Sequence, residues 1–359
     1  MNIKNKIISI LSSILVLSLI LSGYKFYDKD KLGKNSNIES ENKLVAEEVI
    51  SEDIESLDED STTFKDGANA YELNIEGIME QLTCDTYLSR KVGTEENIKA
   101  MKFIKNYFEA IGLQPFNNGN YYHDVRGMRG ELLNQLGVPN NTDVKNVIGV
   151  IKGEDNKNAV VISAHFDHII LNNAQNTKLQ GAVDNASGVS TLLESAKDLA
   201  EYYKNKKPAH DIIFAAFNAE ELGLIGSMAF VQEFKDNYDK WYNINIDCIG
   251  IKDEGGLAVE NNVERSQELY NDFIDVLDKN DVNYEMVPYA MNEDGRIVGT
   301  SDHAVFSKYD SASLIIGQCG ISDVVHTTND SMEIIDVELI NEIKDVLVEF
   351  IIESDSKIY

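Results

Sequence analysis

The chain has 359 residues, of which 43% are hydrophobic, enough to form a large buried core. Its formal net charge of −29 argues against nucleic acid or an anionic membrane surface as a partner, because a polyanion repels phosphate groups. Three cysteines, Cys84, Cys248 and Cys319, are too few for a disulfide scaffold and allow one bridge at most.

The first 23 residues have the pattern of an export signal. Lys4 and Lys6 precede an apolar and serine run from Ile7 to Ser22. That run is slightly shorter than the roughly 20 residues that span a bilayer, so an uncleaved membrane anchor is the alternative. We expect residues 1–23 to be a signal peptide or N-terminal anchor and the protein to be exported, either secreted or held at the cell surface. Membrane contact is expected only through these residues.

Residues 24–66 contain few periodic apolar positions. Between Glu39 and Asp60 the chain has ten acidic residues and a single basic one, Lys43. Such a segment repels itself and buries little, which predicts a disordered acidic spacer, with a short pro-segment as the alternative. The folded domain is expected over residues 67–359.

The folded part alternates between predicted helices and strands. In GTEENIKAMKFIKNYFEAIGL, Thr94 is placed to cap a helix that Gly112 ends. Apolar runs predict strands over residues 146–151, 159–164, 212–217, 241–246 and 313–316. Helices are expected over residues 188–203, 222–234, 266–279 and 337–353. This alternation predicts an α/β fold: a single doubly wound domain with a mostly parallel central sheet flanked by helices.

The run DIIFAAFNAEELGLIGS places two adjacent carboxylates, Glu220 and Glu221, just after a buried strand. Working groups of open parallel sheets lie beyond the carboxyl ends of the strands. Adjacent side chains point in different directions, so one carboxylate could hold a metal ion while the other faces substrate. The alternative is a solvated acid pair at the start of a helix, where acidic residues are common.

Five candidate metal ligands fall at or just past predicted strand ends, on one edge of the sheet. They are His165, Asp184, Glu221, Asp247 and His326. Taken singly, the HxD pair of His165 with Asp167 could be incidental, and Asp184 could be a helix cap. Together, two histidines and three carboxylates suit two zinc-like ions if one carboxylate bridges them. Glu220 would then be a spare carboxylate beside the metals, where a general base is needed.

The ordered motifs SAHFDHI, GAVDNASG, FNAEELGLIGS, NIDCIG, TSDHAVF and VVHTTND resemble those of the secreted zinc aminopeptidases of the M28 peptidase family. The resemblance runs from about Glu72 to the C-terminus. It implies that His165 and Asp247 bind one zinc ion, that Glu221 and His326 bind the other, and that Asp184 bridges them. It also implies Glu220 as general base, Asp167 as the carboxylate behind His165, and a cis peptide bond after Asp184.

Some features fall outside that ligand set. Asp302 and His303 in TSDHAVF match a family signature and are expected to support the site rather than bind metal. Some relatives supply a tyrosine just before this motif, which supports the tetrahedral intermediate of the reaction. The present chain has no tyrosine there, and Arg296 is the residue expected to take its place. His168 is expected to support the site from outside the ligand set or to lie at the surface, and metal binding by its ring is the less favoured alternative. His123 and His210 are expected to be solvated.

These features predict a metallo-exopeptidase that removes the N-terminal residue from peptides with a free N-terminus, using two Zn²⁺ ions per chain. Other divalent ions such as Co²⁺ or Mn²⁺ would also suit carboxylate-rich sites. Glutaminyl cyclisation with one zinc ion is an alternative, which a metal count near one per chain would favour. Dipeptidase or carboxypeptidase specificity is also open. A non-catalytic binding module is the remaining alternative, but such a protein need not keep the complete ligand set and base.

Overall fold

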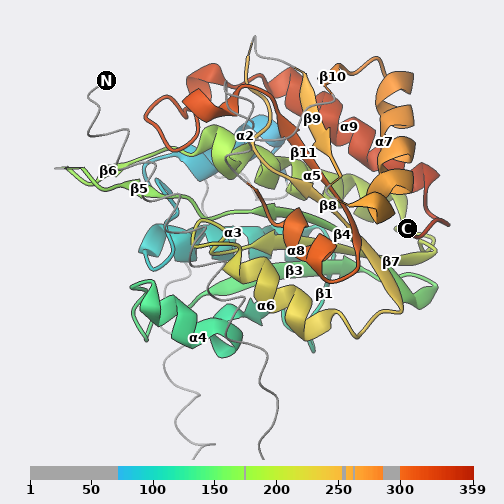
Figure 1. Cartoon of the computed structure of the whole chain (residues 1–359), viewed down its shortest axis with the longest axis horizontal. Helices are drawn as coiled ribbons and strands as arrows, with labels where there is room; N and C mark the ends of the chain where they lie inside the picture. Colours follow the sequence, from blue (N-terminus) through green and yellow to red (C-terminus); the bar gives the residue numbers. More distant parts are fainter. Residues whose placement is uncertain (1–71, 174, 253–255, 262, 286–299) are drawn as a thin grey trace, which may run out of the picture. The chain divides into compact units, whose positions relative to one another are not determined.

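A mixed sheet of nine strands organises the computed structural model, which describes residues 72–173, 175–252, 256–261, 263–285 and 300–359 (Figure 1). The strand order is β1-β3-β7-β4-β8-β11-β9-β10, and β2 pairs with β3. The strands are β1 (Gln114–Pro115), β2 (Tyr122–Asp124), β3 (Lys145–Ile151), β4 (Asp155–His165), β7 (His210–Phe217), β8 (Lys240–Ile246), β9 (Leu257–Glu260), β10 (Tyr284–Glu285) and β11 (Ala312–Gln318). A separate two-stranded ribbon joins β5 (Ile170–Leu171) and β6 (Thr177–Lys178).

The strand directions divide the sheet into a centre and two flanks. Strands β7, β4, β8 and β11 run parallel, whereas β3 is antiparallel to β7 and β9 is antiparallel to β11. The predicted α/β domain with helices around a central sheet is therefore confirmed. The parallel part of the sheet consists of the four central strands. The strands on either side of this part, β3 and β9, pair with it in the antiparallel direction.

Both faces of the central strands are covered by helices (Figure 1). One face packs against helices that include α5 and α9, and the other packs against α6 and α8. Alternate residues of a strand point to opposite faces, so in β7 Phe214 joins the first core and Phe217 the second. The helices are α2 (Ile75–Thr83), α3 (Glu95–Ala110), α4 (Val125–Gln135), α5 (Ser187–Tyr202), α6 (Ile225–Phe234), α7 (Gln267–Lys279), α8 (His303–Lys308) and α9 (Val337–Glu353).

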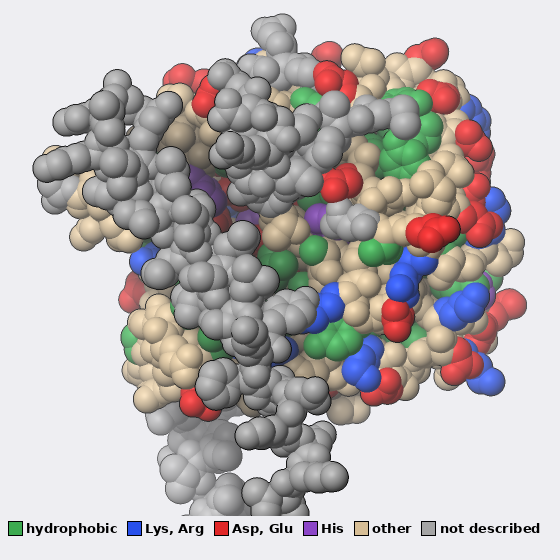
Figure 2. Space-filling view, in the orientation of Figure 1, with side chains coloured by type: hydrophobic (Ala, Val, Ile, Leu, Met, Phe, Trp, Pro, Cys, Tyr) green, Lys and Arg blue, Asp and Glu red, His purple; other side chains and the backbone are tan. Residues whose placement is uncertain are grey.

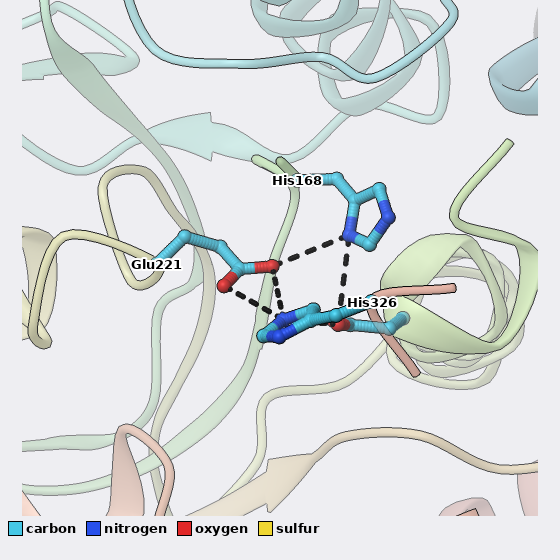
Figure 3. A group of neighbouring side chains, drawn as sticks. His168, Glu221 and His326 are labelled. Carbon is cyan, nitrogen blue, oxygen red and sulfur yellow. Dashed lines mark hydrogen bonds and ion pairs between the residues drawn. The ribbon is translucent and has the colours of Figure 1, made fainter. Parts of the chain in front are cut away.

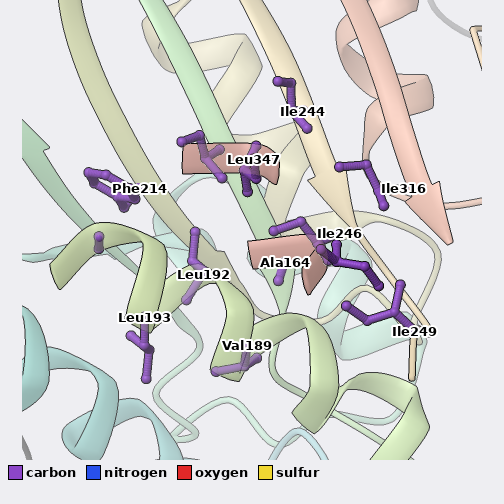
Figure 4. Close-up of a cluster of buried hydrophobic side chains, with 14 of the residues drawn as sticks. Ala164, Val189, Leu192, Leu193, Phe214, Ile244, Ile246, Ile249, Ile316 and Leu347 are labelled. Atoms are coloured by element: carbon purple, nitrogen blue, oxygen red, sulfur yellow. The ribbon is translucent and has the colours of Figure 1, made fainter. Parts of the chain in front are cut away.

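The largest core lies between the sheet and α5 (Figure 4). Val189, Leu192 and Leu193 of α5 belong to the same buried cluster as Ala164 of β4 and Ile246 of β8. These side chains are fully buried. Because α5 is fixed against the strand ends, the turn that precedes it is also fixed there.

Most sequence-based boundaries agree with the structure. The helix capped by Thr94 is α3, and the Thr94 hydroxyl accepts a hydrogen bond of 3.4 Å from the N–H of Asn97. One predicted helix begins later than expected, at Ile225 rather than Leu222. The carbonyl of Glu220 accepts from the N–H groups of Gly223 and Leu224, and this turn separates the strand from the helix.

The prediction of a solvated His123 was wrong. His123 lies in β2 and is fully buried. Its Nδ1 accepts a hydrogen bond of 2.9 Å from the side-chain amide of Asn146, and its Nε2 lies 3.1 Å from a carboxylate oxygen of Glu233. The sequence around His123 is polar and therefore suggests exposure. Its burial depends on Asn146 and Glu233, which come from distant segments of the chain.

The expected signal or anchor (residues 1–23) lies outside the described residues, as does the acidic spacer up to residue 66. Both stay predictions. Within the described ranges, no helix combines the length and apolarity needed to cross a membrane. All three cysteines are free, so the possible disulfide is not formed.

Candidate active site

The predicted site residues converge at the carboxyl ends of three neighbouring parallel strands. His165 is the last residue of β4, Asp247 directly follows β8, and the Glu220-Glu221 pair lies just past β7. Asp184 comes from a short π-helical turn, Ala182–Ala186, that leads into α5. His326 lies in the loop beyond β11. In the space-filling view, histidine and acidic side chains are visible together on the face shown (Figure 2).

The first ligand group contains His165, Asp184 and Asp247. Nε2 of His165 lies 3.2 Å from Oδ1 of Asp247 and 3.3 Å from Oδ1 of Asp184. All three residues are buried. Each offers one ligand atom, and these atoms lie within 4.8 Å of one another, so the group could hold a metal ion.

The second group is formed by His168, Asp184, Glu221 and His326. Figure 3 shows His168, Glu221 and His326 facing one another. Nε2 of His326 lies 3.1 Å from Oδ2 of Asp184 and 2.9 Å from Oε2 of Glu221. Asp184 therefore presents Oδ1 to the first group and Oδ2 to the second. This is the arrangement that a bridging carboxylate requires.

The electrostatics of these groups suit divalent cations. The side chain of His326 is 48% exposed; its partial desolvation would lower its pKa, but the carboxylates of Glu221 and Asp184 raise that pKa to about 11. Burial alone would likewise raise the pKa of Asp184, but His168, His165 and His326 hold it well below its usual value. The same carboxylate charge that attracts imidazole protons would attract a metal ion, and binding would displace those protons. The residues present therefore fit metal ions.

Asp167 connects His165 to the glutamate pair. Its backbone carbonyl lies 3.1 Å from Nδ1 of His165, whereas its carboxylate Oδ1 is 3.8 Å away. The carboxylate accepts hydrogen bonds of 3.0 Å from the N–H of Glu220 and 3.3 Å from the N–H of Glu221. The sequence-based expectation placed this carboxylate behind His165. In the structure its hydrogen bonds fix the backbone of the two glutamates.

Glu220 is the carboxylate of the pair that does not belong to either ligand group. Burial raises the pKa of Glu220 well above its ordinary value, while the nearby His165 acts in the opposite direction. A carboxylate with a raised pKa beside the ligand groups is chemically suited to accept a proton and return it.

Three residues that support the ligands were missed from the sequence. Buried Arg90 donates to the backbone carbonyls of Leu82, Phe166, Gln180 and Gly181. Asp330 accepts from the N–H groups of Val183 and Asp184, at 2.6 and 3.2 Å. No local pattern identifies Arg90, but Asp330 lies inside VVHTTND, four residues after His326, and could have been found there.

The third missed residue, Asn185, joins the Asp184 turn to the end of β8. Its amide donates 3.0 Å to the carbonyl of Ile246, and its Oδ1 accepts from the N–H of Gly188. A Cβ at Gly188 would lie 2.3 Å from Oδ1 of Asn185 and 2.5 Å from the carbonyl of Ile246, so this close approach requires glycine. The peptide bond between Asp184 and Asn185 is cis, which confirms that expectation.

Four further residues were singled out from the sequence: Asp302, His303, His168 and Arg296. Asp302 is buried, accepts a hydrogen bond from the Ser227 hydroxyl, and has its pKa raised by burial to about 7. Neither Asp302 nor His303 belongs to a ligand group. His168 is not at the surface, because it is buried beside Glu221. Arg296 lies outside the described residues.

The fold and the site define an α/β protein whose parallel central strands carry groups able to hold metal ions at their carboxyl edge. Residues 146–351 match the family model described as Peptidase family M28, which covers more than half of the chain. The chain belongs to peptidase family M28.

Similar proteins include aminopeptidases and a glutaminyl cyclase. The chain is 30% identical over 299 residues to Aminopeptidase YwaD of Bacillus subtilis, covering 76% of this chain and 61% of that protein. The chain thus spans less than two thirds of that relative. The crystal structure of LapA aminopeptidase from Legionella pneumophila superposes with a TM-score of 0.62 at 22% identity, covering 80% and 72% of the two chains. A Bacteroides thetaiotaomicron glutaminyl cyclase bound to N-acetylhistamine has a TM-score of 0.56 at 19% identity, covering 79% and 96%. These two structural likenesses concern the fold.

Proposed function

We propose that the protein is a metal-dependent exopeptidase that removes the N-terminal residue from peptides. The observation that supports this most directly is the pair of ligand groups sharing Asp184, with Glu220 directly beside Glu221. Family membership and the resemblance to Aminopeptidase YwaD agree with it.

His165, Asp184 and Asp247 would hold one ion, and Asp184, Glu221 and His326 would hold a second. Zn²⁺ is the ion we propose, and Co²⁺ and Mn²⁺ suit the same donors. When bound, such ions lower the pKa of a water molecule and polarise the scissile carbonyl.

Glu220 acts as general base and then as general acid in this proposal. Its carboxylate accepts a proton from the attacking water and returns that proton to the leaving amine. Asp167 positions Glu220 through the hydrogen bond of 3.0 Å to its backbone N–H. Holding the carboxylate beside the substrate is worth about 100- to 10,000-fold in rate for a proton relay of this kind.

The second candidate function is glutaminyl cyclisation, an acyl transfer. The fold likeness to the Bacteroides thetaiotaomicron glutaminyl cyclase is the observation that favours it. The complete first group of His165, Asp184 and Asp247 favours hydrolysis over an enzyme with one ion. A zinc content near one per chain would favour cyclisation.

The test is the release of p-nitroaniline from a panel of amino-acid p-nitroanilides, with and without a chelator. Cleavage of free-amine substrates that stops on chelation, with no cleavage of N-blocked substrates, is the expected result. Blocked and free substrates cleaved equally well would contradict the requirement for a free N-terminus. Turnover of N-terminal glutaminyl peptides with no p-nitroaniline release would support cyclisation instead.

We also propose that the protein is exported through residues 1–23. Lys4 and Lys6 before the apolar run Ile7 to Ser22 support this. Expression of the full chain in a secreting bacterial host, followed by mass spectrometry of its N-terminus, tests it. A shortened protein in the medium supports a cleaved signal, an intact one in the membrane fraction supports an anchor, and an intact chain in the cytoplasm contradicts export.

A further inference from the structure

His168 is the one histidine of the second group that the sequence-based ligand set leaves out. It follows Asp167 in the loop after β4, and only 1% of its surface is exposed. Neither of its ring nitrogens meets the geometry of a hydrogen bond to a described residue, although Nδ1 lies at ion-pair distance from two carboxylates. A buried polar atom normally has a partner, so the position of Nδ1 among these carboxylates requires an explanation.

The ring points into the second group (Figure 3). Nδ1 of His168 lies 3.2 Å from Oε1 of Glu221 and 3.5 Å from Oδ2 of Asp184. Its ring centroid is 5.9 Å from that of His326. One ligand atom from each of these four residues lies within 4.8 Å of the other three. Nδ1 therefore faces the same small volume as the other donors.

The backbone leaves room for this ring. A Cβ at Gly181 would lie 2.7 Å from Cδ2 of His168, closer than real Cβ contacts allow. Gly181 also has a φ of 59°, a left-handed conformation that glycine adopts readily. The same Cβ would lie 2.6 Å from the backbone carbonyl of Asp184 and 2.7 Å from Nη2 of Arg90, so glycine is required where the Asp184 turn, Arg90 and His168 meet.

We propose that His168 is a fourth protein ligand of the second metal site, binding through Nδ1 together with Asp184, Glu221 and His326. This rests on the metal binding in the proposed function but not on its substrate. The two sites then differ. The second offers two imidazoles and two carboxylates, whereas the first offers one imidazole and two carboxylates.

This asymmetry has a chemical consequence. Zinc sites with four protein ligands are closed, whereas those with three keep an open position for water or substrate. The second site should therefore hold its ion more tightly and fill first. The first site, at His165 and Asp247 and close to Glu220, should keep the open position.

Zn²⁺ titration of the metal-depleted full chain, with a competing chelator, tests the affinities. The wild type should bind two ions, and His168→Ala should weaken one of them by more than about 100-fold. That exceeds the roughly 10- to 100-fold loss typical of a residue that only orients a ligand. The matched control is His210→Ala, because His210 begins β7 at the end of the strand opposite the site. It should bind both ions as the wild type does.

A second measurement on the wild type counts the imidazole ligands directly and does not depend on the variant folding. With nitrogen-labelled histidine and spin-active Cd²⁺, each coordinated ring nitrogen is split by coupling to the metal nucleus. Three split imidazoles, including His168 Nδ1, are expected. Two split imidazoles, with the His168 resonance unsplit, would overturn the proposal whatever the effect of His168→Ala on affinity.

The p-nitroanilide assay of the same zinc-loaded wild type separates the two proposals. Active, chelator-sensitive protein with only two coordinated imidazoles would overturn the role of His168 and leave the exopeptidase intact. Three coordinated imidazoles in a protein that cleaves no free-amine substrate would support the ligand role and contradict the exopeptidase.

Discussion

Nη2 of Arg90 donates a hydrogen bond of 2.9 Å to the backbone carbonyl of Gly181, three residues before Asp184. The same guanidinium donates from Nε, also at 2.9 Å, to the carbonyl of Phe166, the residue after His165. One buried side chain thus joins the loops that carry a ligand of the first group and the shared carboxylate. Burial lowers the pKa of Arg90 to about 10, so it remains charged at neutral pH.

Replacing Arg90 by lysine should destabilise the fold. A lysine cannot reproduce the planar fork that reaches several carbonyls, and each buried acceptor left without a donor costs about 1–3 kcal/mol. We expect Arg90→Lys to lower the free energy of unfolding by about 2–4 kcal/mol in urea denaturation. The matched control is Arg265→Lys, at a partly exposed arginine paired with Asp310. Its expected change is within about 0.5 kcal/mol. Equal stability of both variants would contradict the role of Arg90.

Replacing Glu220 by glutamine should separate metal binding from catalysis. Glutamine keeps the size of the side chain but cannot accept the proton. We expect Glu220→Gln to reduce kcat by about 100- to 10,000-fold with unchanged zinc content. Rate assays with a free-amine p-nitroanilide and metal analysis of the same sample measure both. Turnover close to that of the wild type would remove Glu220 from the proton relay.

The count of ions should depend on Asp247. Asp247 belongs only to the first group, so Asp247→Asn should reduce the zinc content from two ions to one per chain. Asp239→Asn is the matched control, since this exposed aspartate precedes β8 at its opposite end. Metal analysis after dialysis gives the result. An unchanged content of two ions in Asp247→Asn would show that Asp247 is not a required ligand.

The stability of the metal-depleted protein should depend on His303 between pH 6.5 and 4. Burial lowers the pKa of His303 from 6.5 to about 4. Between these values the unfolded chain binds a proton that the folded chain does not, so stability falls as the pH decreases. His303→Gln should remove up to about 3 kcal/mol of this dependence. Urea denaturation of both proteins at several pH values measures it, and parallel curves would contradict it.

Much of the fold could be predicted because the information is local. The closing helix Val337–Glu353 has the predicted ends, and β8 Lys240–Ile246 begins only one residue earlier than expected. Apolar periodicity reports directly which faces are buried. The motifs also placed His165, Asp184, Glu221, Asp247 and His326 at strand ends or in loops. Parallel strands bring their carboxyl ends to one edge, so their convergence could be predicted without coordinates.

The directions of the flanking strands could not be obtained in this way. An apolar run such as that of β3 suits a buried strand in either direction, and only its pairing with β7 makes it antiparallel. The burial of His123 has the same origin, since Asn146 and Glu233 reach it from distant segments. The polarity of neighbouring residues in the sequence does not indicate which distant residues will contact a side chain after folding.

The sequence by itself determined the family, the order of the elements and the residues that can bind metal, because spacing and chemical type are properties of the chain. Only the tertiary structure decided which carboxylate oxygen faces which histidine, that Arg90 fixes two loops, and that His168 lies inside the second group. Those relations depend on distances between segments far apart in sequence. They exist only once the hydrophobic cores on both faces have fixed the sheet and its loops.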